Sequence, residues 1–176
     1  LLAFWIYNQN GTKISPGTWV ILAGGDSLDF ASYFVMTELW WKNAVPAAFA
    51  VGSIITFGYA LARKRFEWPD PFDRFVIGVD TLITLLWWQF TTATEANLLY
   101  QATTVMAFVP MYRGLLNRKE TEQPLPWVLW SVALLLFFVL AVSEPWTLEE
   151  AVYPIVGLLT HFAVVVIVLY KERARR

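Results

Sequence analysis

The chain consists of long runs of apolar residues separated by short polar or charged segments. An apolar run of about 20 residues makes a helix long enough to cross the roughly 30 Å hydrocarbon core of a bilayer. The pattern predicts one short helix over residues 1–7, followed by six longer spans. These spans are predicted over residues 16–37, 44–61, 72–90, 92–116, 126–142 and 147–171.

Residues typical of helix N-termini stand at the start of four of these spans. Two starts pair a capping side chain with a proline, whose missing N–H costs nothing in a first helical turn. Two others have the spacing of a capping box, in which a Thr and a Glu three residues later satisfy each other's backbone N–H groups. The starts are Ser15-Pro16, Asp70-Pro71, Thr92 with Glu95, and Thr147 with Glu150.

The first predicted helix is too short to cross a bilayer. Its seven residues would extend about 10 Å, roughly a third of the length that a span needs. We therefore expect part of the first span to lie upstream of Leu1.

The composition is that of a membrane protein. Hydrophobic residues make up 57% of the chain and charged residues 15%, and the mean hydropathy is +0.50. The ten Trp and seven Tyr side chains suit the two interfaces of a bilayer. A net charge of −1 argues against a nucleic-acid partner. The absence of Cys and the presence of one His argue against a disulfide framework, an iron–sulfur site or a zinc site.

Basic residues are concentrated on one side of the predicted topology. Twelve of the thirteen lie in the loops after the first, third and fifth helices or in the C-terminal tail, and Lys42 alone lies on the other side. The positive-inside rule places those loops and the tail in the cytoplasm and the N-terminus outside. The twelve are Lys13, Arg63, Lys64, Arg65, Arg74, Arg113, Arg118, Lys119, Lys171, Arg173, Arg175 and Arg176.

A weak internal repeat relates the two ends of the chain. Pairs that match at an offset of 108 residues include Trp19/Trp127, Pro46/Pro154 and Arg65/Arg173. Two parallel halves, each with an odd number of helices, require one additional helix between them to reverse the chain. We therefore predict a first triple-helix bundle over residues 1–65, a linker helix over 66–91, and a second triple-helix bundle with a basic tail over 92–176.

The segment around the fifth and sixth spans resembles a known family. FVPMY at residues 108–112 is followed by a charged loop, and PWVLW at residues 126–130 then opens the next helix. This arrangement resembles the SWEET/PQ-loop superfamily, and in particular small bacterial membrane proteins with its 3+1+3 helices. Met111 stands where the family has Gln, and the first half has Trp5-Ile6 where the family has Pro-Gln. The vitamin-precursor transporters of the PnuC type are a more distant resemblance.

The resemblance implies an all-α, polytopic membrane protein with seven transmembrane helices. It implies a small-solute transporter or facilitator with alternating access between the two three-helix halves, in a bacterial inner membrane. The expected partners are the lipid bilayer and a small-molecule solute. The paired Asn residues that bind sugar in SWEET proteins are absent, and Ser53 and His161 stand near their positions.

Six polar side chains within the predicted spans are candidates for lining a solute site: Asp26, Asp29, Ser53, Gln101, Thr104 and His161. A charged group inside a bilayer is costly and by default faces the protein interior or a water-filled cavity. The two carboxylates share a helix face because they are three residues apart. They could bind a cation, a proton or a cationic substrate. Alternatively, they could satisfy backbone donors where Gly24-Gly25 loosens the helix, or pair with another helix.

The other candidates also allow two interpretations. His161 could relay protons or contact the solute opposite Ser53, or it could make a hydrogen bond to a neighbouring helix. Gln101 and Thr104 could line the same cavity or link helices by hydrogen bonds. No nucleophile–base pair or metal-ligand set is visible, so neither an enzyme nor a cofactor is predicted.

Three prolines, Pro46, Pro110 and Pro154, are predicted to break helical hydrogen bonds and to serve as hinges. The alternative function is a non-catalytic accessory subunit of a larger membrane complex, which would contact other subunits through the linker helix and an aromatic surface. Asp80 in the linker helix is predicted to make a packing contact, with Gln89 or with another subunit.

Overall fold

The computed structural model describes residues 1–9, 16–37, 40–63, 69–90, 92–117, 122–143 and 146–174. These residues form seven α-helices and no strand, so the predicted all-α class is confirmed. The helices are α1 (Leu2–Gln9), α2 (Pro16–Thr37), α3 (Ala44–Ala62), α4 (Pro71–Phe90), α5 (Ala93–Leu116), α6 (Pro124–Val142) and α7 (Leu148–Arg173). Every predicted helix corresponds to one of these, with both ends within two residues of the prediction.

Local capping explains where the helices begin. At α5 the Thr92 side chain accepts the backbone N–H of Glu95 at 3.2 Å, and the Glu95 carboxylate accepts the backbone N–H of Thr92 at 2.9 Å. The predicted capping box is therefore present. Before α4, Asp70 and Asp73 exchange the same two bonds, at 2.8 and 3.1 Å. The predicted cap at Ser15 lies outside the described residues.

The start of α7 differs from the prediction. Thr147 accepts the backbone N–H of Glu150 at 3.3 Å, which is half of a capping box. The Glu150 carboxylate binds Lys42 instead of returning to the backbone of Thr147. The other half of the predicted box is therefore wrong, because a bond to a charged amine is stronger than a bond to a neutral N–H.

Two groups of three helices, α1–α3 and α5–α7, have corresponding neighbours. In the first group α3 contacts α1 and α2, and in the second α7 contacts α5 and α6. The groups meet where α2 packs against α5 and where α1 packs against α6. These two contacts are equivalent if α1, α2 and α3 correspond to α5, α6 and α7. Helix α4 packs against α2 and α5 at the outside of the bundle.

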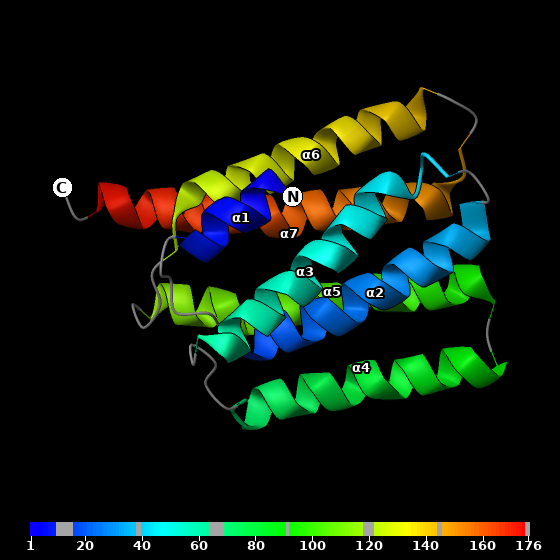
Figure 1. Cartoon of the computed structure of the whole chain (residues 1–176), viewed down its shortest axis with the longest axis horizontal. Coiled ribbons are helices and arrows are strands. Elements are labelled where there is room, and N and C mark those ends of the chain that lie inside the picture. The colour runs from blue at the N-terminus through cyan, green and yellow to red at the C-terminus, as the bar shows by residue number, and fades with distance from the viewer. Residues whose placement is uncertain are drawn as a thin grey trace.

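Helix α1 is short and lies close to α3. Its eight residues start near the middle of the bundle's long axis (Figure 1). The ring of Phe4 packs directly on Gly52 of α3, where a Cβ atom would overlap the ring. Glycine at this position lets the two helices approach closely.

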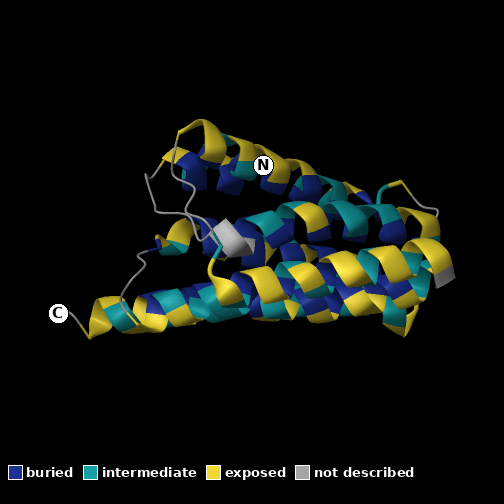
Figure 2. Cartoon of the chain, turned by 90° about the horizontal axis from the view of Figure 1, so that it is seen from below, coloured by how far each residue is buried: buried dark blue, intermediate teal, exposed yellow. Residues whose placement is uncertain are grey.

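Each long helix has an exposed face on the outside of the bundle (Figure 2), and many large hydrophobic residues lie on these faces. Large hydrophobic residues are exposed on every long helix, for example Phe34 on α2, Leu85 on α4 and Leu136 on α6. Among the described helices, α3, α6 and α7 are long and apolar enough to cross a membrane. The chain is therefore a membrane protein whose outer surface suits lipid.

Two of the three predicted helix breaks lie inside helices. Pro110 is within α5 and Pro154 is within α7. Pro46 is the third residue of α3, where a backbone N–H has no partner within the helix in any case. The break predicted at Pro46 therefore does not occur.

Candidate functional site

A small cavity lies at the centre of the bundle, where the two groups of helices meet. Its volume is about 20 Å³, which is room for about one water molecule. Helices α2, α3, α5 and α7 each contribute polar side chains to its wall. These are Asp26, Asp29, Ser53, Gln101, Thr104 and His161. The structure therefore brings all six sequence-predicted site residues to one cavity.

The two carboxylates connect α2 to its neighbours. Asp26 and Asp29 are 8% and 2% exposed. Asp26 accepts a hydrogen bond from the Ser53 hydroxyl on α3, and Asp29 accepts one from the Gln101 amide on α5 at 2.9 Å. The predicted pairing with other helices is therefore observed, and the partners are not backbone donors near Gly24-Gly25. In the described part of the chain both partners are neutral, so no cationic side chain compensates either carboxylate.

His161 is held by its own helix. Its Nδ1 lies 2.7 Å from the carbonyl of Gly157, so this nitrogen donates the hydrogen and Nε2 is an acceptor. This nitrogen therefore bonds within α7, and it does not make the alternative bond to a neighbouring helix that the sequence predicts. Four aromatic rings lie 5.0 to 5.8 Å from the imidazole centroid: Phe49, Phe108, Trp127 and Trp130.

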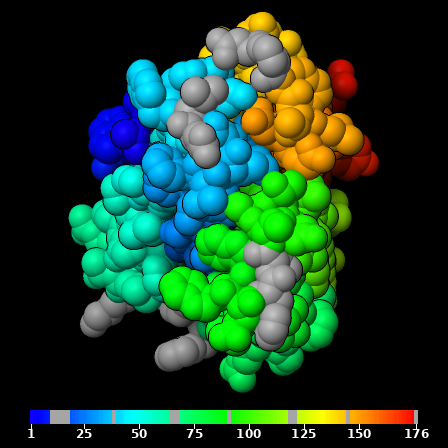
Figure 3. Space-filling view, turned by 90° about the vertical axis from the view of Figure 1, so that its right-hand side faces the viewer, coloured from blue at the N-terminus to red at the C-terminus, as the bar shows by residue number. Residues whose placement is uncertain are grey.

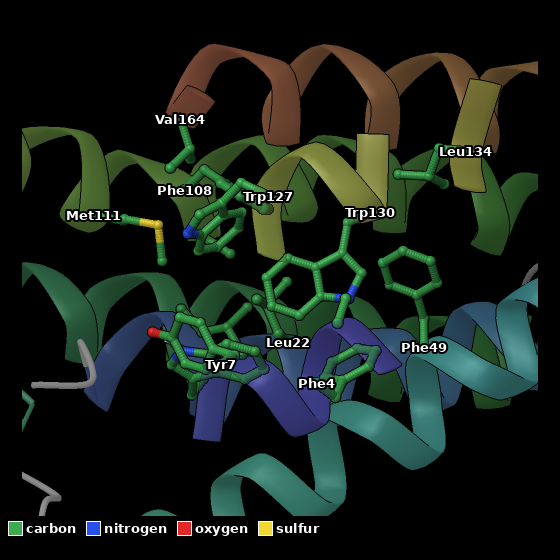
Figure 4. Packing of buried hydrophobic residues seen from close by; sticks show 14 of the residues in the cluster. Phe4, Tyr7, Leu22, Phe49, Phe108, Met111, Trp127, Trp130, Leu134 and Val164 are labelled. Carbon is green, nitrogen blue, oxygen red and sulfur yellow. Dashed lines mark hydrogen bonds between the residues drawn. The ribbon is translucent and has the colours of Figure 1, made fainter. Parts of the chain in front are cut away.

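Aromatic side chains supply most of the remaining wall. They are Phe4, Trp19, Phe49, Trp127, Trp130 and Tyr153. The Trp130 ring meets both Phe4 and Trp127 edge to face, with centroids 4.8 Å apart in each pair (Figure 4). Trp19, Trp127 and Trp130 are at most 3% exposed and so belong to the interior, not to an interfacial belt. Trp40 and Trp88, at 80% and 82% exposed, have the exposure that such a belt requires.

A buried ion pair joins the two groups at one end of the bundle. Lys42 Nζ lies 2.7 Å from Glu150 Oε2, and the two side chains are 3% and 11% exposed. The Tyr33 hydroxyl of α2 donates to the carbonyl of Glu150 at 3.3 Å. Figure 3 looks onto this end, where the beginnings of α3 (cyan) and α7 (orange) flank the end of α2 (blue). Lys42 and Glu150 are separated by 108 residues, which is the offset of the sequence repeat.

A hydrogen-bonded network joins the groups at the opposite end. Glu122 accepts from the Tyr7 hydroxyl at 2.9 Å and from Trp127 Nε1 at 3.2 Å. The Tyr7 hydroxyl in turn accepts from Trp19 Nε1 at 3.2 Å. The network ties α1 and α2 of the first group to the start of α6 in the second. Trp19 and Trp127, the matched tryptophans of the repeat, both donate to it.

Four residues at the two ends are not predicted as functional from the sequence: Tyr7, Lys42, Glu122 and Glu150. Glu150 has the position of a helix cap, and Glu122 has the position of a loop charge. The separation of Lys42 and Glu150 by the repeat offset is the signal that could have identified that pair.

Asp80 lies outside the cavity. It is 8% exposed, and its Oδ2 would be 3.8 Å from a Cβ placed on Gly24 of α2. The Thr103 side chain of α5 interacts with the Asp80 carboxylate. Its packing partners are therefore α2 and α5, and the predicted contact with Gln89 is not observed.

Among the described residues, no group of three or more His, Asp or Glu side chains is arranged to hold a metal ion. Comparisons of the chain with protein-family models, with curated proteins and with solved structures give no match.

Proposed function

We propose that the chain is a small-solute transporter or facilitator of the SWEET/PQ-loop type, with the solute site between its two three-helix halves. One observation carries the proposal. A cavity lined by polar side chains from four helices lies between two similarly packed groups, and buried polar contacts hold the groups together at both ends. Buried polar groups cost free energy in an apolar bundle, so their concentration at one cavity indicates a function beyond packing.

The distribution of polar side chains supports seven spans. Helices α2, α4 and α5 are less apolar than α3, α6 and α7, but several of their polar residues near mid-helix are buried. Asp29, Asp80 and Gln101 are buried, whereas Leu85 and Val105 are exposed. Such helices are apolar where they meet lipid and polar where they meet protein, which lowers their average hydropathy without preventing them from crossing a bilayer.

The described basic residues support the proposed orientation. They lie at the ends of α3, α5 and α7 and at the beginning of α4, all at the end of the bundle opposite Lys42: Arg63, Arg74, Arg113, Lys171 and Arg173. By the positive-inside rule, we propose that this end faces the cytoplasm and that the Lys42–Glu150 pair faces the outside.

The two end contacts give alternating access a structural basis. Separation of Lys42 from Glu150 opens the cavity to the outside, while the Glu122 network keeps the cytoplasmic end closed. Separation of Glu122 from Tyr7 opens the opposite end. The prolines inside α5 and α7 supply points at which these helices bend.

The first test measures solute uptake by purified protein in proteoliposomes, using a panel of neutral and charged small solutes. Asp26→Asn removes a charge from the cavity wall but keeps a similar shape, and we expect it to reduce uptake about tenfold, the effect of losing about 1.4 kcal/mol of binding. His161→Ala is also expected to reduce uptake. Asp73→Asn is the control, because Asp73 is buried at the start of α4 and does not line the cavity. Normal uptake by both Asp26→Asn and His161→Ala contradicts the proposal.

A static accessory subunit of a larger membrane complex is the second candidate. The volume of the cavity, about 20 Å³, favours it, because no solute larger than water fits without movement of the helices. If the chain is an accessory subunit, the native particle extracted in mild detergent should contain unrelated subunits in fixed stoichiometry. If the chain is a transporter, the extracted particle should be a monomer or a homo-oligomer of this chain.

A further inference from the structure

Two buried carboxyl groups line the cavity, and their partners among the described residues are neutral side chains. Asp26 and Asp29 accept hydrogen bonds from a hydroxyl and an amide. Lys42, a buried cationic side chain, binds Glu150 at one end of the bundle instead. A carboxylate in an apolar interior is costly unless a positive charge accompanies it. The cavity therefore suits a ligand that brings a positive charge.

The rest of the wall favours an organic cation over a metal ion. Hard metal ions need a shell of oxygen ligands, whereas six of the fifteen residues that line this cavity are Phe, Trp or Tyr. Aromatic faces attract ammonium groups through their negative π surfaces. Two carboxylates beside several indole and phenyl rings are the combination that recognises a small ammonium group.

An unsatisfied donor at the same cavity points to a second group on the ligand. Trp130 is 3% exposed, and its Nε1 has no hydrogen-bond partner among the described residues. Figure 4 shows this nitrogen on the edge of the indole that faces Phe49, another residue of the cavity wall. A buried N–H without an acceptor is costly. A hydroxyl or carbonyl oxygen on the ligand would satisfy it.

We propose that the cavity binds a small organic ammonium solute that also carries a hydrogen-bond acceptor. The ammonium group lies against Asp26 and Asp29, and the acceptor faces Trp130 Nε1. This inference rests on the proposed transport function and specifies its substrate class. Because the closed cavity holds about one water molecule, the solute enters only when the two helix groups separate.

Three small probes separate the two recognition elements. Ethanolamine carries both an ammonium and a hydroxyl group, ethylamine lacks the hydroxyl, and ethylene glycol lacks the ammonium. We expect titration calorimetry on the full chain in detergent to give the tightest binding for ethanolamine. Ethylamine should bind about tenfold more weakly, which is the upper range for one hydrogen bond. Ethylene glycol should show no binding.

Variants show which residues recognise the ammonium group and which recognise the hydrogen-bond acceptor. Asp26→Asn and Asp29→Asn are expected to weaken the binding of both amines by about tenfold or more. Trp130→Phe keeps an aromatic ring and removes only the N–H donor. It is expected to make ethanolamine bind no better than ethylamine, without changing ethylamine itself. Asp73→Asn, which changes a buried carboxylate at the start of α4 outside the cavity, should leave the binding of all three probes unchanged.

The outcomes distinguish this inference from the proposed function. Binding of ethylene glycol as tight as that of ethanolamine, or no binding of ethanolamine, overturns the inference while proteoliposome uptake of a neutral solute would still support transport. Unchanged preference for ethanolamine in Trp130→Phe also overturns it, and this variant decides the matter if the Asp variants fail to fold. Ethanolamine binding as expected, without uptake of any solute, supports the ligand class and contradicts transport.

Discussion

Replacing Lys42 with Met is expected to lower the free energy of unfolding by about 3–5 kcal/mol, because it leaves the buried carboxylate of Glu150 without its cation. The pair is 2.7 Å long and nearly inaccessible, so solvent cannot compensate for the lost partner. Unfolding of the purified protein in mixed micelles with increasing SDS, followed by circular dichroism, measures the change.

The double variant Lys42→Met with Glu150→Leu provides the control. It removes both charges and fills the space with apolar atoms, so most of the lost stability should return. If the single variant is as stable as the unmodified protein, or if the double variant is as unstable as the single one, the ion pair does not hold this end of the bundle closed.

Replacing Glu122 with Ala is expected to lower the free energy of unfolding by about 2–4 kcal/mol, because two buried donors lose their acceptor together. The carboxylate accepts from the Tyr7 hydroxyl and from Trp127 Nε1, and Trp19 Nε1 depends on the same Tyr7 oxygen. These groups lie among aromatic rings, where water cannot replace the lost bonds. The same SDS titration measures the loss.

Glu122→Gln is the matched variant. It keeps one oxygen as an acceptor, so we expect it to cost about 1 kcal/mol, the value of a typical net hydrogen bond. Equal stability of the Ala and Gln variants would show that the network contributes little, and that the cytoplasmic end is held by apolar packing instead.

The helices could be predicted from the sequence because the signals are local. Apolar run lengths, prolines in first turns and the Thr92–Glu95 capping box each depend on a few neighbouring residues. The capping box predicted at Thr147 is the instructive exception. Glu150 has the required spacing, but its carboxylate binds Lys42, which comes from another part of the chain. A rule based on neighbouring residues cannot account for a bond to a residue 108 positions away in the sequence.

The polar composition of the site was predictable, but its pairing was not. A polar residue in a membrane helix must face inward, which suffices to choose Asp26, Asp29 and Gln101. The repeat offset pairs Ser53 with His161, yet the Ser53 hydroxyl binds Asp26 and His161 binds its own helix. These partners depend on the rotation of each helix about its axis, which an apolar pattern without strong periodicity does not determine.

The aromatic wall was not predictable for a related reason. Tryptophan suits both a membrane interface and a protein interior, and composition favours the interface. Trp130 lies in the interior because α1 and α6 pack against each other and bring Phe4 against its ring. Only the packing of these two helices reveals that Trp130 lines the cavity and that its N–H is buried without a partner among the described residues.

The central claim is that the cavity opens to water during a transport cycle, and thiol labelling tests it most directly. The chain contains no Cys, so Ser53→Cys introduces a single thiol at the cavity wall, on a residue that is 1% exposed. Thr56→Cys is the matched control, one turn away on α3, 0% exposed and bonded to Asn8 outside the cavity.

A membrane-impermeant maleimide is added to the protein in sealed liposomes. We expect Ser53→Cys to be labelled and Thr56→Cys to remain unlabelled, with faster labelling of Ser53→Cys when Lys42→Met is also present. Equal protection of both thiols would contradict the claim, and the polar cavity would then be a packing feature of a static subunit.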